Sequence, residues 1–253
     1  NVVAIDLAGN KTETKVPFYI KSFKEKIDDI KISDEFVNSV SKHVLENSNM
    51  NVPSSIVETF VKTNKELREK NLQTIKEVVK KNLPNAADNP FDVKPFIRLP
   101  NAATFAQFGE RRHYFYNEQK IDEAWHLGMD WASVKRASIV TTNPGKVIFR
   151  GYLGIYGESI IIDHGLGIAS LYAHTSSQSV DVGDMVVAGQ EIGNTGSTGA
   201  VFGDHLHFGI LIQGIEANPN EWLDSNWMKL NLTNTINSAI KIIDGNKKWN
   251  KEQ

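Results

Sequence analysis

The sequence predicts an α+β protein in which an N-terminal helical segment precedes an antiparallel β-sheet domain. Apolar residues recur at helical spacing between residues 33 and 82, which indicates amphipathic helices. From about residue 104 to residue 215 the pattern changes to short β-rich runs separated by glycine turns, as in an antiparallel sheet or sandwich. A connector rich in Pro, Asn and Asp, "NLPNAADNPFDVKPF", lies between the two parts. We therefore expect a helical segment with its linker over residues 21–100 and a β domain over residues 101–225.

Two helices account for the predicted helical segment. The first covers the stretch "SDEFVNSVSKHVLE". The second follows "PSSIVE", where Ser54 or Ser55 is the expected N-cap and Glu58, three residues after Ser55, completes a capping box. Lys and Glu fill the face opposite the apolar stripe, and we interpret them as a solvated helix surface.

The two ends of the chain have a different character from the parts between them. Residues 1–20 alternate weakly and contain the turn-like cluster "DLAGN". They resemble the closing strands of a bacterial immunoglobulin-like module, and we predict that they are a remnant of one. Residues 226–253 form a tail with one expected short helix near "TNTINSAIKII".

Composition excludes several classes of function. The 253 residues carry a formal net charge of -2, which does not favour a nucleic-acid binder. The absence of cysteine excludes thiol catalysis, disulfides and Cys-ligated zinc. No apolar run approaches the roughly 18 residues that a membrane span needs. The chain starts without Met or a signal peptide, so we expect a mature form or a fragment, with room for a membrane anchor or further domains upstream.

Two short motifs bring histidines and a carboxylate into the β domain. In "HLHFGI", strand alternation places His205 and His207 on one face, about 7 Å apart. In "HLGMD", His126 and Asp130 share a face of an extended chain, and the intervening Gly128 leaves that face clear. Zinc commonly binds His nitrogen and carboxylate oxygen, and catalytic sites use three protein ligands and a water. His126, Asp130 and one of the two strand histidines would supply such a set, although solvated strand faces would explain each motif taken alone.

The remaining histidines carry weaker signals. His174, in "SLYAHTSS", stands at a strand end, where its spacing alone allows either a solvent-exposed or a functional position. His164 lies in the turn sequence "DHG", His113 follows "ERR" on an expected strand, and His43 lies on a helix surface. We interpret these last three as structural.

Four motifs follow one another in the β domain: "HLGMD", "SLYAH", "VGDMVVAGQEIGNTGSTG" and "GDHLHF". In this order, within residues 104–223, they resemble the lysostaphin/LytM-type zinc endopeptidases, which cleave peptide bonds of bacterial peptidoglycan. The resemblance implies a zinc endopeptidase domain with an open groove. It also implies zinc ligands at His126, Asp130 and His207 and catalytic histidines at His174 and His205.

The chain also resembles one branch of this family and departs from its pattern at two positions. "GYLGIYGESIIIDHGLGIASLYAH" and "NPNEWLD" resemble a periplasmic, proteobacterial branch in which helices precede the catalytic domain. Asp204 stands where the family often has Pro, and Gly209 stands where it often has Glu. Neither position binds metal in the family pattern, so the departures concern the shape of the groove.

On this resemblance, the expected function is zinc-dependent hydrolysis of peptidoglycan crosslinks, with D-Ala to diamino-acid links favoured. Peptidoglycan stem peptides are the expected partners, and the periplasm or cell envelope is the expected location. We assign His205 provisionally as the base and His174 as the partner of the oxyanion, and these roles could be exchanged.

Other classes of protein stay open at this point. A catalytically silent or latent relative would act as a peptidoglycan-binding or activator module. The hairpin "VDVGDMVVAGQEIG" also resembles biotinyl and lipoyl carrier domains, but no Lys stands in a suitable motif around it. A structural metal site in a lectin-like sandwich is a further alternative. The helical segment could pack beside the groove, block the zinc, or serve as a spacer or partner-binding arm.

Overall fold

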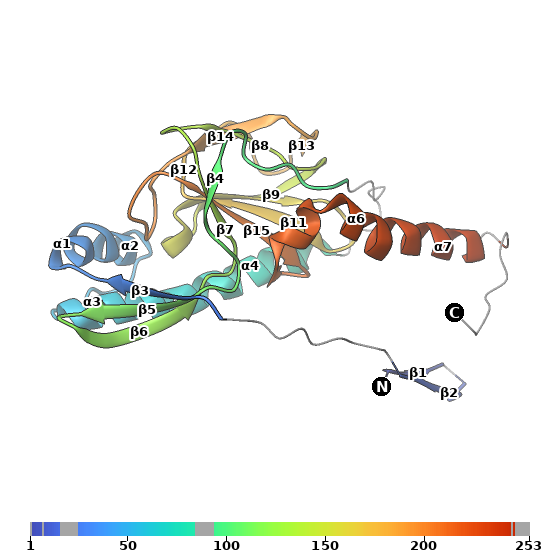
Figure 1. Cartoon of the computed structure of the whole chain (residues 1–253), viewed down its shortest axis with the longest axis horizontal. Coiled ribbons are helices and arrows are strands. Elements are labelled where there is room, and N and C mark those ends of the chain that lie inside the picture. The colour runs from blue at the N-terminus through green and yellow to red at the C-terminus, as the bar shows by residue number, and fades with distance from the viewer. Residues whose placement is uncertain (1, 7, 16–24, 84–93, 244, 246–253) are drawn as a thin grey trace.

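The computed structural model describes residues 2–6, 8–15, 25–83, 94–243 and 245. Figure 1 shows a large sheet at the centre, a smaller sheet beside it, and helices and strands from the N-terminal part on the other side. The predicted α+β class is confirmed, with a helical segment before a β domain. Among the described residues, no helix combines the length and the apolar character needed to cross a membrane.

The large sheet is antiparallel throughout and has the strand order β13-β9-β10-β11-β15-β7-β4, with β16 paired to β15. Its strands are β4 (Ala103–Ala106), β7 (Met129–Ala132), β9 (Gly145–Tyr152), β10 (Glu158–Asp163), β11 (Ile168–Ala173), β13 (Met185–Val186), β15 (Leu206–Ile212) and β16 (Ile215–Ala217). The smaller sheet has the order β12-β14-β8, with β8 (Ser138–Val140), β12 (Thr175–Gln178) and β14 (Glu191–Thr195).

Both faces of the central strands of the large sheet are covered. On one face Trp131 and Phe208 stack, with ring centroids 4.7 Å apart, inside the largest apolar cluster. On the other face, Ile75 and Val79 of helix α4 (Arg68–Asn82) belong to a second cluster with residues of β10 and β11. Because neither face meets water, every residue of β11 is buried, and the strand carries no strict apolar-polar alternation.

The helical segment contains two continuous helical runs. The first comprises α1 (Asp34–Phe36), a π-helical turn η1 (Val37–Ser41) and α2 (Lys42–Asn47); the second comprises α3 (Ile56–Lys62), a π-helical turn η2 (Thr63–Leu67) and α4. The Ser55 hydroxyl accepts a hydrogen bond from the Glu58 N–H at 3.4 Å and so caps α3. Both predicted helices, and Ser55 as the cap, are confirmed.

A three-stranded sheet joins the helical segment to the β domain. The sequence predicted a strand at His113 but not the strand at residues 27–31 that pairs with it. Strand β3 (Ile27–Lys31) pairs in parallel with β5 (Arg111–Tyr116), which pairs in antiparallel with β6 (Gln119–Trp125). We call this sheet, together with helices α1 to α3 and turn η2, the accessory layer. The sequence of β3, "IDDIK", has too few apolar residues to indicate a strand.

Apolar and polar contacts hold the helices of the accessory layer to its sheet. The rings of Phe60 and Tyr114 lie 5.0 Å apart in a small buried cluster. Beside them, the buried carboxylate of Asp122 on β6 accepts a hydrogen bond from Asn64 at 2.9 Å and lies 3.1 Å from the Lys65 ammonium. Asp122 is buried whereas Lys65 is largely exposed, so truncating Lys65 would leave a buried carboxylate with Asn64 as its partner.

The ends agree in part with the predictions. Strands β1 (Val2–Ile5) and β2 (Lys11–Thr14) form an antiparallel hairpin, and their origin in an immunoglobulin-like module stays a prediction. After α5 (Pro219–Leu223), the elements α6 (Ser225–Met228), η5 (Lys229–Thr233) and α7 (Asn234–Ile243) form one run that is longer than the expected short helix. Most of the predicted connector, residues 84–93, lies outside the described residues.

Candidate metal centre

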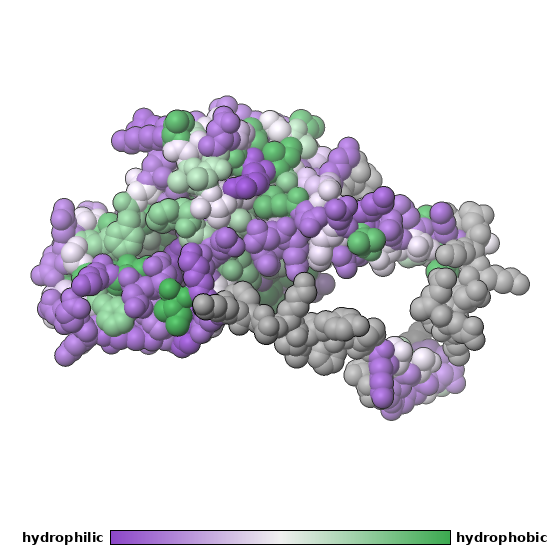
Figure 2. Space-filling model, in the orientation of Figure 1, coloured by the Kyte–Doolittle hydropathy of each residue, from purple (hydrophilic) through white to green (hydrophobic). Residues whose placement is uncertain are grey.

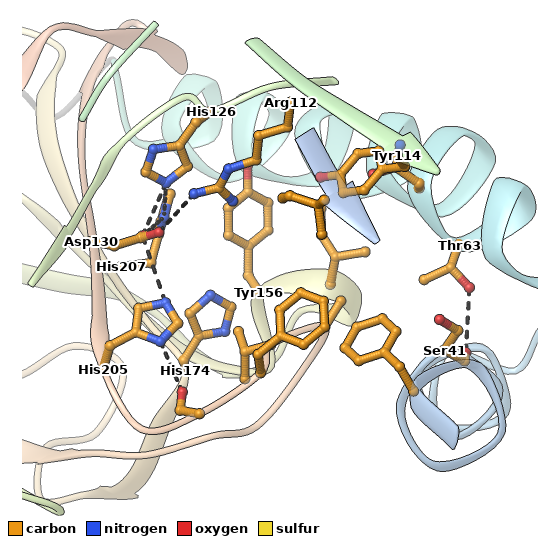
Figure 3. Close-up of a pocket in the computed structure, with 18 of the residues that line it drawn as sticks. Ser41, Thr63, Arg112, Tyr114, His126, Asp130, Tyr156, His174, His205 and His207 are labelled. Carbon is orange, nitrogen blue, oxygen red and sulfur yellow. Dashed lines mark hydrogen bonds and ion pairs between the residues drawn. The ribbon is translucent and has the colours of Figure 1, made fainter. Parts of the chain in front are cut away.

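Two side chains from one short stretch and a third from a distant strand bring one ligand atom each to a common point. His126 Nε2 lies 3.0 Å from Asp130 Oδ1 and 3.1 Å from His207 Nδ1, and His207 Nδ1 lies 2.8 Å from Asp130 Oδ1. All three residues are buried. Figure 3 shows them converging on one side of a pocket. They are the only group of His, Asp and Glu in the described residues with the spacing of a metal site.

Strand pairing explains why these side chains meet. His207 on β15 is the direct partner of Asp130 on β7. His126 follows β6 in an extended, non-helical stretch, and its backbone N–H donates to the carbonyl of Glu110 at 2.9 Å. A side chain at Gly128 would place its Cβ 2.5 Å from the His207 ring, so only glycine leaves room there. The expected clear face between His126 and Asp130 is thus present.

The hydrogen-bond pattern around the cluster indicates a cation. His126 Nδ1 donates to the backbone carbonyl of Gln107 at 2.9 Å, so a neutral His126 has only a lone pair at Nε2. This lone pair faces the carboxylate oxygen of Asp130 at 3.0 Å, which is also an acceptor. Two buried acceptors at this distance repel each other unless a positive charge lies between them, either a metal ion or a second proton on the His126 ring. A metal bound to the His126, Asp130 and His207 atoms removes the conflict, and two His nitrogens with one carboxylate oxygen suit zinc.

Burial sets the protonation of this cluster. It lowers the pKa of His207 to about 4, so His207 is neutral at pH 7. Burial opposes ionisation of Asp130, but interactions with His126 and His207 outweigh it and hold the pKa of the carboxyl well below its ordinary value. A neutral imidazole and an ionised carboxylate are the forms in which these groups bind metal.

Two further histidines lie beside the cluster. The rings of His174 and His205 are 4.9 Å apart, and His205 Nε2 lies 3.7 Å from Asp130 Oδ1. His174 Nδ1 donates to the carbonyl of Thr198 at 2.8 Å, and His205 Nδ1 donates to the carbonyl of Gly203 at 2.9 Å. Both neutral rings therefore leave Nε2 free to take a proton. Burial, followed by the neighbouring His205 and His207, holds the pKa of His174 well below its ordinary value.

A pocket of about 350 Å³ opens on these five residues, and the accessory layer forms its opposite wall. The far end is apolar and includes Phe36, Phe60 and Tyr114 of the accessory layer. Phe36 stacks on Phe202 of the loop before β15, with ring centroids 4.2 Å apart. Figure 2 shows apolar surface where the β domain meets the accessory layer. The helical segment therefore lies beside the pocket, and its effect on the site stays a prediction.

Comparison with known proteins identifies the domain that contains this site. Residues 124–219 match peptidase family M23. The chain contains an M23 peptidase domain. This confirms the resemblance to the lysostaphin/LytM family, and the matched segment includes all five histidine and aspartate positions described above.

Three relatives match about half of this chain or less. The DD-carboxypeptidase/endopeptidase Mpg of Neisseria meningitidis is 33% identical over 129 residues, which are 51% of this chain and 28% of that protein. The murein hydrolase activators EnvC and NlpD of Escherichia coli are 36% and 38% identical, over 43% and 40% of this chain and 26% and 27% of their own lengths. The chain thus spans well under half of these relatives.

Solved structures were also found for this domain. The catalytic domain of lysostaphin from Staphylococcus simulans is 28% identical with a TM-score of 0.42, and the match covers 49% of this chain and 94% of that one. A zinc-containing peptidase from Vibrio cholerae is 26% identical with a TM-score of 0.44, over 52% of this chain and 39% of that one.

The other predicted histidines lie outside the cluster of the M23 domain. His164 is buried between the Pro144 carbonyl and the Ser170 hydroxyl, each 2.7 Å from a ring nitrogen, and burial lowers its pKa to about 4. His113 on β5 lies 3.3 Å from Asp29 of β3. His43 is exposed on α2. The contacts of His164 and His113 agree with structural roles, and His43 lies on the helix surface as expected.

One charged residue of the site, Arg112, was not predicted from the sequence. Arg112 of β5 donates from Nη2 to Asp130 Oδ2 at 3.0 Å. The signal was present in "ERRHYFY", because strand alternation places Arg112 on the same face as the apolar Tyr114. A charged side chain on the apolar face of a strand usually has a buried partner.

Proposed function

We propose that this chain is a zinc-dependent endopeptidase that hydrolyses peptide crosslinks of bacterial peptidoglycan, with links between D-Ala and a diamino acid as the preferred bond. The proposal rests on the buried cluster of His126, Asp130 and His207. Two further histidines with free Nε2 atoms lie beside this cluster. The M23 domain and the relatives named endopeptidase support the same reaction. Because peptidoglycan lies outside the cytoplasmic membrane, we also propose a periplasmic or cell-envelope location.

The residues divide into metal ligands and groups that act on the substrate. His126 Nε2, Asp130 Oδ1 and His207 Nδ1 would hold the zinc. When bound, zinc supplies Lewis acidity at a scissile carbonyl and makes water acidic enough to ionise near neutral pH. The five residues share the polar end of the pocket, so a peptide bond placed there would lie within reach of both remaining histidines.

His174 and His205 would move the protons of the reaction. We assign proton uptake to His205, because its Nε2 lies closer to Asp130 than the His174 ring does. The contact with the developing oxyanion is then assigned to His174. A proton taken up by a histidine can pass to the leaving amine, which completes the exchange. The matching hydrogen bonds at both Nδ1 atoms allow the reverse assignment, and the single-residue variants below distinguish the two.

A second candidate function is an activator or binding module for another peptidoglycan hydrolase. Relatives named murein hydrolase activators match part of this chain, which favours this alternative. The three proposed ligands and the two neighbouring histidines would then catalyse no reaction of their own.

A digest distinguishes the two candidates. Zinc-loaded protein is incubated with isolated sacculi and with crosslinked muropeptide dimers, with His205→Ala as the control, and mass spectrometry reports the products. We expect dimers to become monomers only with the intact protein, and the new termini identify the bond. Intact dimers together with bound zinc would instead favour the activator module.

A further inference from the structure

One short stretch, which runs from the turn after β4 into strand β5 of the accessory layer, contacts two of the three metal ligands. The Gln107 carbonyl accepts from His126 Nδ1 at 2.9 Å, and the Arg112 guanidinium donates to Asp130 Oδ2 at 3.0 Å. Both residues precede the segment that matches the M23 family, residues 124–219. The polar environment of the metal centre therefore extends beyond the family match into the accessory layer.

The two oxygens of Asp130 have separate partners. Oδ1 faces His126 Nε2, His207 Nδ1 and His205 Nε2, at 3.0, 2.8 and 3.7 Å. Oδ2 faces Arg112 Nη2. The Asp130 side chain is 6% exposed and the Arg112 side chain 22%, so water does little to replace a lost contact. Arg112 thus holds the carboxylate in the rotation that presents Oδ1 to the two ligand nitrogens.

The accessory layer fixes Arg112 in turn. Arg112 is paired with Asp28 of β3 and with Ala124 of β6, so strands on both sides set its position. The turn before β5 is held by the Glu110 carboxylate, which accepts from the Gln107 N–H at 2.9 Å and from the Lys26 ammonium at 2.5 Å. Strand pairing and the contacts of the buried Glu110 carboxylate therefore place both groups that contact the ligands.

We propose that Arg112 is a positioning residue for Asp130, through which the accessory layer completes the metal centre. This inference rests on the proposed zinc site. Hydrogen-bond partners of metal ligands orient the ligand atoms before the metal arrives, and their loss typically weakens metal affinity by about 10–100-fold. Arg112 acts through Asp130 and needs no contact with the substrate.

The neighbouring Arg111 provides a matched control. It lies on the opposite face of the same strand, where it donates to Glu123 at 2.8 Å and to Glu25 at 3.3 Å. Arg111→Met removes the same charge from the same strand without touching the metal cluster. A general weakening of the sheet would therefore affect both variants, whereas a role in positioning Asp130 belongs to Arg112 alone.

The test measures metal binding by the full chain without substrate. Zn²⁺ affinity is determined by competition with a chromophoric chelator, and Co²⁺ is used as a spectroscopic probe of the ligand geometry. We expect Arg112→Met to bind Zn²⁺ about 10–100-fold more weakly and to change the Co²⁺ absorption, with Arg111→Met like the wild type. Wild-type affinity and an unchanged Co²⁺ spectrum in Arg112→Met would overturn the proposal.

Arg112→Gln covers the case in which Arg112→Met does not fold. It keeps a polar side chain but loses the charge and the reach of the guanidinium, so weaker Zn²⁺ binding is again expected, and unchanged binding overturns the proposal. A failure of the proposed hydrolytic function would show itself differently, as zinc-loaded wild-type protein that leaves muropeptide dimers intact.

Discussion

Replacing His207 with alanine should abolish both zinc binding and peptidoglycan hydrolysis. His207 Nδ1 is one of the three proposed ligand atoms, and it lies 2.8 Å from Asp130 Oδ1. A site with two protein ligands lacks the coordination that catalytic zinc requires. Metal content after dialysis, measured by mass spectrometry on the purified protein, and the cleavage of crosslinked dimers check the two parts of this expectation.

His113→Ala is the matched control for this variant. His113 lies on β5 and contacts Asp29 and Glu123 outside the cluster, so its removal should leave zinc content and hydrolysis intact. Circular dichroism shows whether both variants keep the fold. A folded His207→Ala protein that retains one zinc per chain would refute the proposed ligand set.

Removing either His174 or His205 should leave zinc in place and slow hydrolysis. Neither ring belongs to the three-atom cluster, and both leave Nε2 free at the pocket. Because general acid-base groups typically contribute about 10²–10⁴-fold to the rate, we expect kcat to fall by that factor in each alanine variant. Zinc content and steady-state rates on muropeptide dimers measure the two effects separately.

The pH dependence of these variants assigns the base. The variant that lacks the base should lose the rise of kcat/KM on the acidic side of the profile, whereas the other should retain it. His43→Ala, an exposed position on α2, is the control and should behave like the wild type. Normal turnover by His174→Ala would show that this ring takes no part in the reaction.

Local patterns were sufficient to predict much of the fold. The helical spacing and the Ser55 cap located the two helical runs, because both signals depend on residues close in sequence. Strand β3 was missed, because "IDDIK" is polar and forms a strand only through its pairing with β5, more than eighty residues later. The continuous helical run after residue 224 also exceeded what the polar tail indicated.

The candidate site was predictable to a similar extent. Strand alternation placed His205 and His207 on one face but did not choose between them, and the resemblance to a family selected His207. The pairing of His207 with Asp130 across β15 and β7 then brings together residues that no local pattern connects. Arg112 was not singled out, because its partner is a side chain that only the folded structure brings near.

The most direct test of the account follows hydrolysis through removal and return of the metal. One preparation of the protein is freed of metal with a chelator, divided, and assayed on crosslinked muropeptide dimers before and after one equivalent of Zn²⁺ is added. If hydrolysis depends on zinc, we expect no cleavage by the metal-free protein and restored cleavage with Zn²⁺. Cleavage that survives removal of the metal, or no cleavage by the zinc-loaded protein, would contradict it.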